Sequence, residues 1–160
     1  LLVWGPLMVG GSYYVLAGQW SWDVAWLSLV FALGPTTVLF GKHTDKLEAD
    51  RAKGVNTLPV ILGEKLSRYS VLGMLAAQYL LSTLLVVSGV FGWPLLLVWG
   101  ALPVMRGMVD IFRRPKPDSP PQGYPGEIWP LWFSAHAFRH TRRFTSLFLV
   151  GVILDTVLRG

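Results

Sequence analysis

Long apolar runs separated by polar stretches dominate this chain, and they predict an all-α, polytopic membrane protein. Five runs are long enough, at about 1.5 Å per residue, to cover most or all of a hydrocarbon core about 30 Å thick. We expect each to be a membrane-spanning helix: Leu1–Ala17, Val24–Phe40, Tyr69–Phe91, Pro94–Phe112 and Phe144–Leu158. Prolines inside three of the runs are compatible with such helices, because neighbouring groups in a bundle satisfy the freed carbonyls.

Composition supports the membrane class. The chain has 160 residues, of which 52% are hydrophobic and 14% charged, and its mean hydropathy is +0.48. A soluble domain is usually about a quarter charged. The lack of cysteine excludes disulfides, thiolate metal sites and cysteine nucleophiles. The opening residues LLVWGPLMVGG carry no basic region or cleavage site, so we expect the inside of a larger protein rather than a signal peptide.

Basic residues are concentrated in two connections, at about 41–68 and 113–143. The connections around GQWSWD and FGW contain no Lys or Arg. Alternating spans place the two basic loops on one face, and the positive-inside rule makes that face cytoplasmic. We therefore expect residues 1–160 to form one transmembrane domain of a bacterial inner-membrane protein. Because every basic residue except Arg159 lies in or beside these loops, the net charge of +5 reflects topology, not nucleic-acid binding.

The segment KHTDKLEADRAK is densely charged, although it directly follows an apolar run. At roughly 3 kcal/mol for each ionised group at a bilayer centre, its side chains must lie in water or be held for a purpose. A solvated loop is one interpretation. If the preceding helix continues, His43, Lys46 and Asp50 share a face, and Lys46 can pair with Asp50.

The same segment is also suited to bind a metal ion and a diphosphate. Its carboxylates, Asp45, Glu48 and Asp50, are hard oxygen ligands of the kind that Mg²⁺ prefers, and Mg²⁺ commonly bridges to substrate phosphates. Its cations suit diphosphate oxygens directly. They are Lys42, Lys46, Arg51 and Lys53. With apolar helices beneath it, this segment favours a phosphate-bearing amphiphile as ligand.

The residues EADRAKGVNTLPVILGE resemble the second Asp-rich motif of the UbiA-type intramembrane aromatic prenyltransferases. The shared features are an acidic residue, Asp-Arg, a Gly four residues after the Asp, Thr-Leu-Pro-Val and Leu-Gly. The preceding GPLMVGGSYY and the later runs are also similar to the family's C-terminal half. The resemblance implies a bundle of nine transmembrane helices, in which the five expected here are the last and the remainder lies upstream in the same chain.

The resemblance also implies an activity: Mg²⁺-dependent transfer of a polyprenyl group from a prenyl diphosphate to an acceptor, expected to be aromatic as in quinone biosynthesis. Asp50 matches the motif's final carboxylate, and Asp50, Asp45 and Glu48 are the expected catalytic and metal-binding residues. The family usually has Asp where this chain has Lys46, and often an acidic residue where it has His43. Because the first Asp-rich motif would lie upstream, we do not expect these residues alone to be catalytically complete.

A second class of function stays open at this point. A non-catalytic transporter or a lipid-binding scaffold can use the same fold, with the bilayer as its partner. An N-D-x-x-D motif upstream would favour the enzyme.

Two further features bear on the fold. His136 and His140, in SAHAFRH, have the spacing of two metal ligands on one helical face. Because the segment is rich in aromatic and basic residues, we expect it instead to be an interfacial amphipathic helix in the headgroup region. Asp155 lies inside the last apolar run, where we expect it to contact another helix.

Overall fold

The computed structural model describes residues 1–160, and all of its regular elements are helices, as the sequence predicts. η1 is a π-helical segment and η2 a 3₁₀ helix. The elements in chain order are η1 (Val3–Gly10), α1 (Gly11–Ala17), α2 (Trp22–Asp45), α3 (Leu47–Ala52), α4 (Leu58–Val87), η2 (Trp93–Ala101), α5 (Leu102–Arg113) and α6 (Trp132–Arg159).

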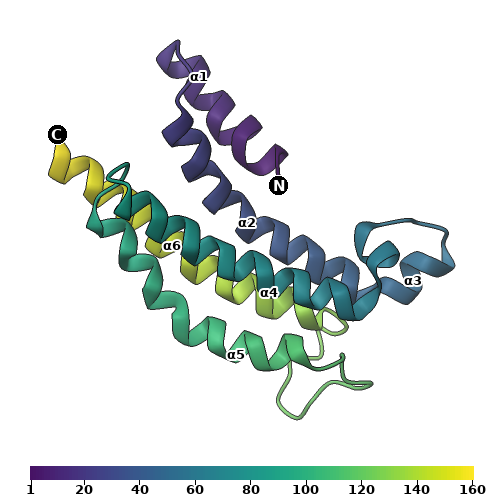
Figure 1. Cartoon of the computed structure of the whole chain (residues 1–160). Coiled ribbons are helices and arrows are strands. Elements are labelled where there is room, and N and C mark those ends of the chain that lie inside the picture. The colour runs from purple at the N-terminus through teal and green to yellow at the C-terminus, as the bar shows by residue number, and fades with distance from the viewer.

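Helix α2 is the centre of the arrangement (Figure 1). It contacts α4, α6 and η1, and η2 in turn contacts α6. Ser21 caps the start of α2, where its hydroxyl accepts a hydrogen bond from the backbone N–H of Val24 at 3.3 Å. Lys42 and His43 lie in the last turn, where positive charge is favourable next to the helix dipole.

Three segments are long and apolar enough to cross a membrane: Trp22–Asp45, Leu58–Val87 and Trp93–Arg113. They correspond to the second, third and fourth predicted spans, although α4 ends at Val87, before the predicted end at Phe91. The chain is an integral membrane protein. The prediction of five spans is wrong for the two terminal runs. η1 and α1 are contiguous, but together they cover only Val3–Ala17, whereas a span needs about 20 residues. The run Phe144–Leu158 is only part of α6, whose first half is rich in basic residues.

The two polar connections contain more helix than the sequence predicts. α2 continues to Asp45 and α4 begins at Leu58, so the segment 41–68 includes two helix ends and α3. α6 begins at Trp132, so the last part of 113–143 belongs to that helix. Hydrogen bonds join the two connections, which therefore lie at the same end of the bundle, as the alternation of spans predicts.

Helices α2 and α6 approach each other closely at two glycines of α2. A Cβ atom on Gly41 would lie 2.9 Å from backbone atoms of Phe133 and Ser134. A Cβ atom on Gly34 would lie 2.8 Å from the side chain of Thr141, whose hydroxyl donates to the Gly34 carbonyl at 3.2 Å. Small residues permit such approaches between membrane helices. The contact holds the first turns of α6 beside the end of α2.

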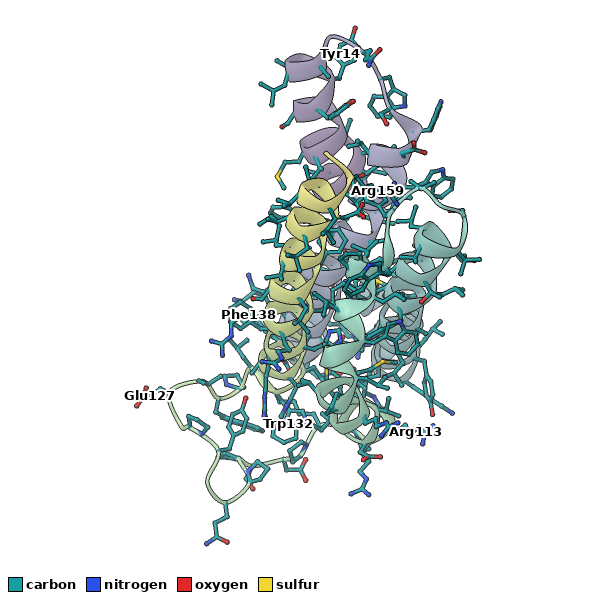
Figure 2. All side chains as sticks on the ribbon, turned by 90° about the vertical axis from the view of Figure 1, so that its left-hand side faces the viewer. Tyr14, Arg113, Glu127, Trp132, Phe138 and Arg159 are labelled. Atoms are coloured by element: carbon teal, nitrogen blue, oxygen red, sulfur yellow. The ribbon has the colours of Figure 1, made fainter.

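At the opposite end of the bundle, Asp155 links α6 to the turn that precedes η2. Its carboxylate is buried and accepts hydrogen bonds from the Gly92 backbone N–H at 2.8 Å and from Arg159 Nε at 2.9 Å. This contact is with the turn before η2, whereas the sequence predicts a contact with another helix. Arg159 also donates to the Val90 carbonyl at 3.2 Å, so its charge is compensated within the bundle. Figure 2 shows Arg159 far from Arg113, which lies near the polar end.

The segment around His136 is not the interfacial helix that the sequence predicts. It forms the first turns of α6, in which Phe133, Ala137 and His140 are completely buried. A hydrogen bond of 2.9 Å joins His140 Nε2 to the hydroxyl of Tyr79 on α4. These side chains therefore belong to the core, because α6 is held against α2 along its length. The two histidines do not form part of a metal-binding cluster.

Candidate functional site

The charged segment is divided by a break in the helix at Lys46, whose φ of −109° is outside the helical range. α2 ends just before this residue and α3 begins just after it. The break turns α3 back so that His43 Nδ1 lies 3.0 Å from Asp50 Oδ2. The pairing of Lys46 with Asp50 in a continuous helix is therefore wrong. A histidine from α2 contacts the Asp50 carboxylate instead.

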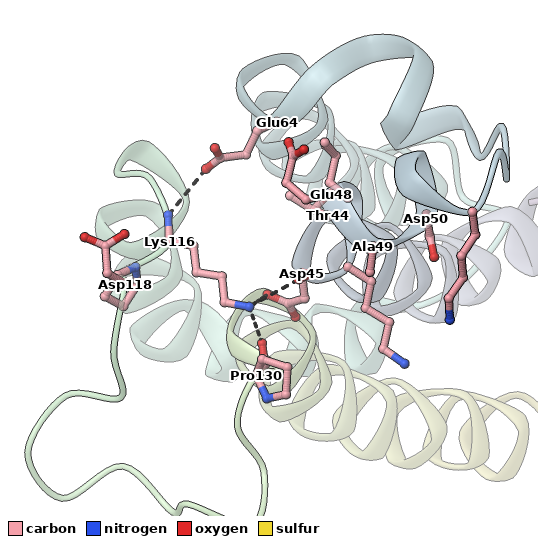
Figure 3. A pocket seen from close by; sticks show the side chains of 13 residues that line it. Thr44, Asp45, Glu48, Ala49, Asp50, Glu64, Lys116, Asp118 and Pro130 are labelled. Atoms are coloured by element: carbon pink, nitrogen blue, oxygen red, sulfur yellow. Dashed lines mark hydrogen bonds and ion pairs between the residues drawn. The ribbon is translucent and has the colours of Figure 1, made fainter.

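A pocket of about 620 Å³ opens at this end of the bundle (Figure 3). The end of α2, α3, the start of α4 and the loop before α6 form its walls. The lining residues are Thr44, Asp45, Lys46, Leu47, Glu48, Ala49, Asp50, Lys53, Glu64, Lys116, Pro117, Asp118 and Pro130. Five of these carry carboxylates and three are lysines, so the pocket has an excess of negative charge that favours a cation.

Asp45 is held in a structural position on one wall of the pocket. Its carboxylate has no exposed surface. The two oxygens accept hydrogen bonds of 2.9 Å from the backbone N–H groups of Phe133 and Ser134. These groups belong to the first turn of α6, whose N–H groups have no partner within the helix. Asp45 therefore caps α6 from the end of α2.

Lys116 crosses the pocket and connects its walls (Figure 3). Its ammonium group donates hydrogen bonds to the carbonyls of Asp45 and Pro130, and it lies 4.9 Å from the ring centre of Trp129. Its backbone N–H donates to Glu64 Oε1 at 3.3 Å. The loop before α6 is thereby fixed to the ends of α2 and α4.

The other predicted site residues have different surroundings. Glu48 is exposed and forms an ion pair of 3.0 Å with Arg51. Lys46 and Lys53 line the pocket and have no ion pair within the chain, so their ammonium groups are available to a ligand. Lys42 and Arg51 do not line it. The structure thus brings together Asp50, Glu48 and two of the four predicted cations.

A magnesium ion in this pocket would need some of its ligands from a substrate or from water. No group of three or more His, Cys, Asp or Glu side chains is placed to hold a metal. Asp45 uses both oxygens in capping, whereas Asp50 uses only Oδ2 and keeps Oδ1 without a hydrogen bond. Mg²⁺ is often held by one or two carboxylates and completed by phosphates and water. Asp50 can supply one such carboxylate, whereas Glu48, two residues earlier on α3, lies on a different face of the helix.

Sequence reasoning missed Lys116 and Glu64. Lys116 stands between two prolines in a polar loop, and its sequence context shows nothing of the helix ends it contacts. Glu64 does have a local signal, because Arg68 follows it at i+4, and the structure places their Oε1 and Nε atoms 3.2 Å apart. Arg68 also donates to the Phe112 carbonyl at 3.1 Å. Glu64 therefore connects the pocket wall to α5 through Arg68.

Comparison with known proteins gives relatives with prenyl-transfer names. The chain is 33% identical over 104 residues to digeranylgeranylglyceryl phosphate synthase of Natronomonas pharaonis. The matched segment covers 63% of this chain and 37% of the relative. It is 28% identical over 103 residues to 2-carboxy-1,4-naphthoquinone phytyltransferase of Synechocystis sp., covering 64% and 34%. It is 33% identical over 97 residues to the bacteriochlorophyll synthase 33 kDa chain of Cereibacter sphaeroides, covering 54% and 32%.

These matches span about a third of the length of each relative. No solved structure matches the chain. The profile of the UbiA prenyltransferase family matches residues 1–140, which include the pocket and every predicted site residue. The chain therefore belongs to the UbiA prenyltransferase family.

Proposed function

We propose that this chain forms part of an enzyme that transfers a polyprenyl group from a prenyl diphosphate to an aromatic acceptor. The observation that carries the proposal is the acidic pocket at the polar end of an apolar bundle, with Asp50 in its wall. A diphosphate head in this pocket would leave its hydrocarbon tail beside the membrane-spanning helices. A quinone-type acceptor is supported by the name of the Synechocystis relative, which acts on a carboxylated naphthoquinone.

Magnesium would be held by Asp50 and, when Glu48 leaves Arg51, by Glu48. When bound, it would neutralise the diphosphate and promote breakage of the C–O bond. Asp45 is retained as a structural neighbour of this site, because its oxygens already cap α6. His43 positions the Asp50 carboxylate through the 3.0 Å contact to Oδ2. The carboxylate is then held in one orientation, which leaves Oδ1 free to bind a ligand.

The lysines contribute separately to the diphosphate. Lys46 and Lys53 line the pocket without an acidic partner, so their ammonium groups can donate to phosphate oxygens. Lys42 of α2 and Arg51 of α3 lie outside the lining and would contact the diphosphate only after a rearrangement of their helices. The apolar helices would exclude water from the allylic cation that remains when diphosphate leaves, so the acceptor ring would form the new bond and then lose a proton to the released diphosphate.

A non-catalytic scaffold that binds phosphate-bearing lipids is the second candidate. It is favoured by Lys46 and Lys53, whose unpaired ammonium groups line the pocket and can bind a phosphate whether or not it is cleaved. Both functions use the same pocket and differ in whether the bound diphosphate is cleaved.

The test uses the full-length protein in phosphatidylcholine bilayers, supplied with geranylgeranyl diphosphate and a panel of hydroxylated benzoates and naphthoates. We expect a prenylated product and released diphosphate with Mg²⁺, and neither after chelation with EDTA. Binding of the diphosphate without product from any acceptor would instead support the scaffold. A rate unchanged by EDTA would contradict a role for magnesium.

A further inference from the structure

Three arginines of α6, Arg139, Arg142 and Arg143, are exposed and have no partner in the chain. No ion pair or hydrogen bond joins their guanidinium groups to another residue. Arg51, Arg68 and Arg159, in contrast, each pair with a nearby carboxylate. Three positive charges therefore remain unneutralised on one side of this helix.

These arginines line a groove between α6 and the η2–α5 segment. A cavity of about 400 Å³ is formed by Gly100, Pro103, Val104, Arg139, Arg142, Arg143 and Ser146. The wall opposite the arginines is built of small side chains, which leaves room for a bulky group. An adjoining cavity of about 160 Å³ shares Pro103, Val104 and Arg139. It also contains His136, whose buried Nε2 atom has no hydrogen-bond partner.

The groove lies at a depth where α2 carries no charged residue. Thr141, between the arginines, donates to the carbonyl of Gly34 at 3.2 Å. Gly34 is near the middle of α2, which carries no charged residue from Val24 to Gly41. Ionised side chains at such a depth normally face an internal partner or a ligand. The long arginine side chains can also extend towards the polar end of the bundle, where headgroups lie.

We propose that Arg139, Arg142 and Arg143 bind the phosphate of an anionic phospholipid from the surrounding bilayer. A guanidinium group offers paired N–H donors that match phosphate oxygens. Basic pockets between membrane helices near the cytoplasmic surface are suited to anionic headgroups. No acidic side chain faces the groove, since Asp110 of α5 lines a different cavity. The groove shares no residue with the pocket around Asp50, so the lipid does not compete for that pocket.

The test is a titration of the full-length protein in detergent with short-chain phosphatidylglycerol or phosphatidylcholine, followed by thermal unfolding. A lipid that binds the folded state raises Tm. We expect phosphatidylglycerol, and not phosphatidylcholine, to raise Tm of the wild type. In the triple variant Arg139→Gln, Arg142→Gln, Arg143→Gln, the phosphatidylglycerol concentration at half-effect should rise at least roughly tenfold.

The matched control removes the same charge elsewhere at this end. Lys65→Gln, Arg113→Gln and Arg114→Gln affect exposed residues outside the groove, and their triple variant should respond like the wild type. Replacing the three groove arginines by lysine keeps the charge but loses the paired donors, so it should weaken binding less than glutamine does.

Three results would overturn the proposal. The first is an equal response from the two glutamine triple variants. The second is a wild type whose Tm does not distinguish the two lipids. The third is a Tm rise with farnesyl diphosphate, lost in the groove triple variant, that is larger than the rise with phosphatidylglycerol. If the glutamine triple variant does not fold, Arg142→Gln alone gives the same comparison against Arg113→Gln. A roughly threefold weaker response of Arg142→Gln would then support the proposal, and no difference would overturn it.

Discussion

At the scale of single residues, two aspartates close in sequence have different environments and therefore different roles. Asp45 is fully buried and spends both oxygens on backbone N–H groups of α6. Asp50 is partly exposed in the pocket and shares only Oδ2 with His43. A carboxylate can bind a hard metal ion only where its oxygen lone pairs are accessible, and the Asp45 carboxylate has no exposed surface. The structure therefore favours Asp50 as the ligand and Asp45 as a cap.

Buried polar pairs at this scale contribute to stability. In Tyr79→Phe the hydroxyl is lost, and the buried Nε2 of His140 is left without a partner. We expect unfolding free energy to fall by about 1–3 kcal/mol, measured by denaturation of the full-length protein in detergent. Tyr69→Phe is the control, because Tyr69 is 47% exposed, and it should change stability little. Equal effects of the two changes would show that the Tyr79–His140 bond contributes nothing.

At the scale of elements, the end of α2 both bounds the pocket and anchors α6. The glycine at position 41 lets the two helices touch, and the Asp45 side chain then reaches the free N–H groups of α6. Lys116 adds the loop before α6 to the same junction. The helix packing that stabilises the bundle also sets the shape of the pocket.

Gly41→Ala tests this junction. The new Cβ atom would lie 2.9 Å from the backbone of Phe133 and Ser134, which cannot move as a flexible side chain would. We expect a loss of about 1–3 kcal/mol of unfolding free energy, together with reduced activity, because α6 and the pocket wall are displaced. Gly73→Ala, in α4 with nothing within 4 Å of its Cβ position, should be neutral or stabilising by up to about 1 kcal/mol. A stable and active Gly41→Ala variant would contradict the close crossing.

At the scale of the whole molecule, the bundle separates a charged end from an apolar body. Only 35 of 160 residues are buried, and many large apolar side chains are exposed, as expected for helices that face lipid or another part of a longer protein. The two basic connections meet at one end, and Trp93 and Arg159 lie towards the other. The positive-inside rule predicts that the charged end faces the cytoplasm.

Single cysteines test that orientation, since these residues contain none. Lys65→Cys and Ser119→Cys are exposed at the charged end, and Gln19→Cys is exposed in the connection between α1 and α2. In a full-length background without other cysteines, a membrane-impermeant maleimide should label the first two only from the cytoplasmic side and the third only from outside. Labelling of positions 65 and 119 from opposite sides would contradict the fold as well as the orientation.

Much of the fold could be predicted from local pattern, whereas the roles of the site residues depended on distant contacts. The runs that became α2, α4 and the η2–α5 segment are recognisable because each is long and nearly free of charge. The two terminal runs do not form spans of their own, because apolar length alone does not show where a helix starts or breaks. Asp45 is predicted to be a metal ligand beside Asp50, since nothing local reveals a cap on residues 88 and 89 positions away.

The central claim is that Asp50, and not Asp45, serves the chemistry, and one paired measurement tests it. Asp50→Asn and Asp45→Asn are compared in the full-length protein for Mg²⁺-dependent prenyl transfer per folded molecule and for Tm. We expect Asp50→Asn to lower turnover at least roughly a hundredfold with Tm nearly unchanged, because several kcal/mol of metal-assisted stabilisation are lost.

Asp45→Asn should lower Tm, because an amide NH2 group, which is a donor, replaces one of the two oxygens that accept hydrogen bonds from α6. The folded fraction should keep most of its turnover. Assays are run well below the lower Tm so that folding and chemistry are read separately. The account would be contradicted if Asp50→Asn kept wild-type turnover. It would also be contradicted if folded Asp45→Asn lost turnover while Asp50→Asn did not.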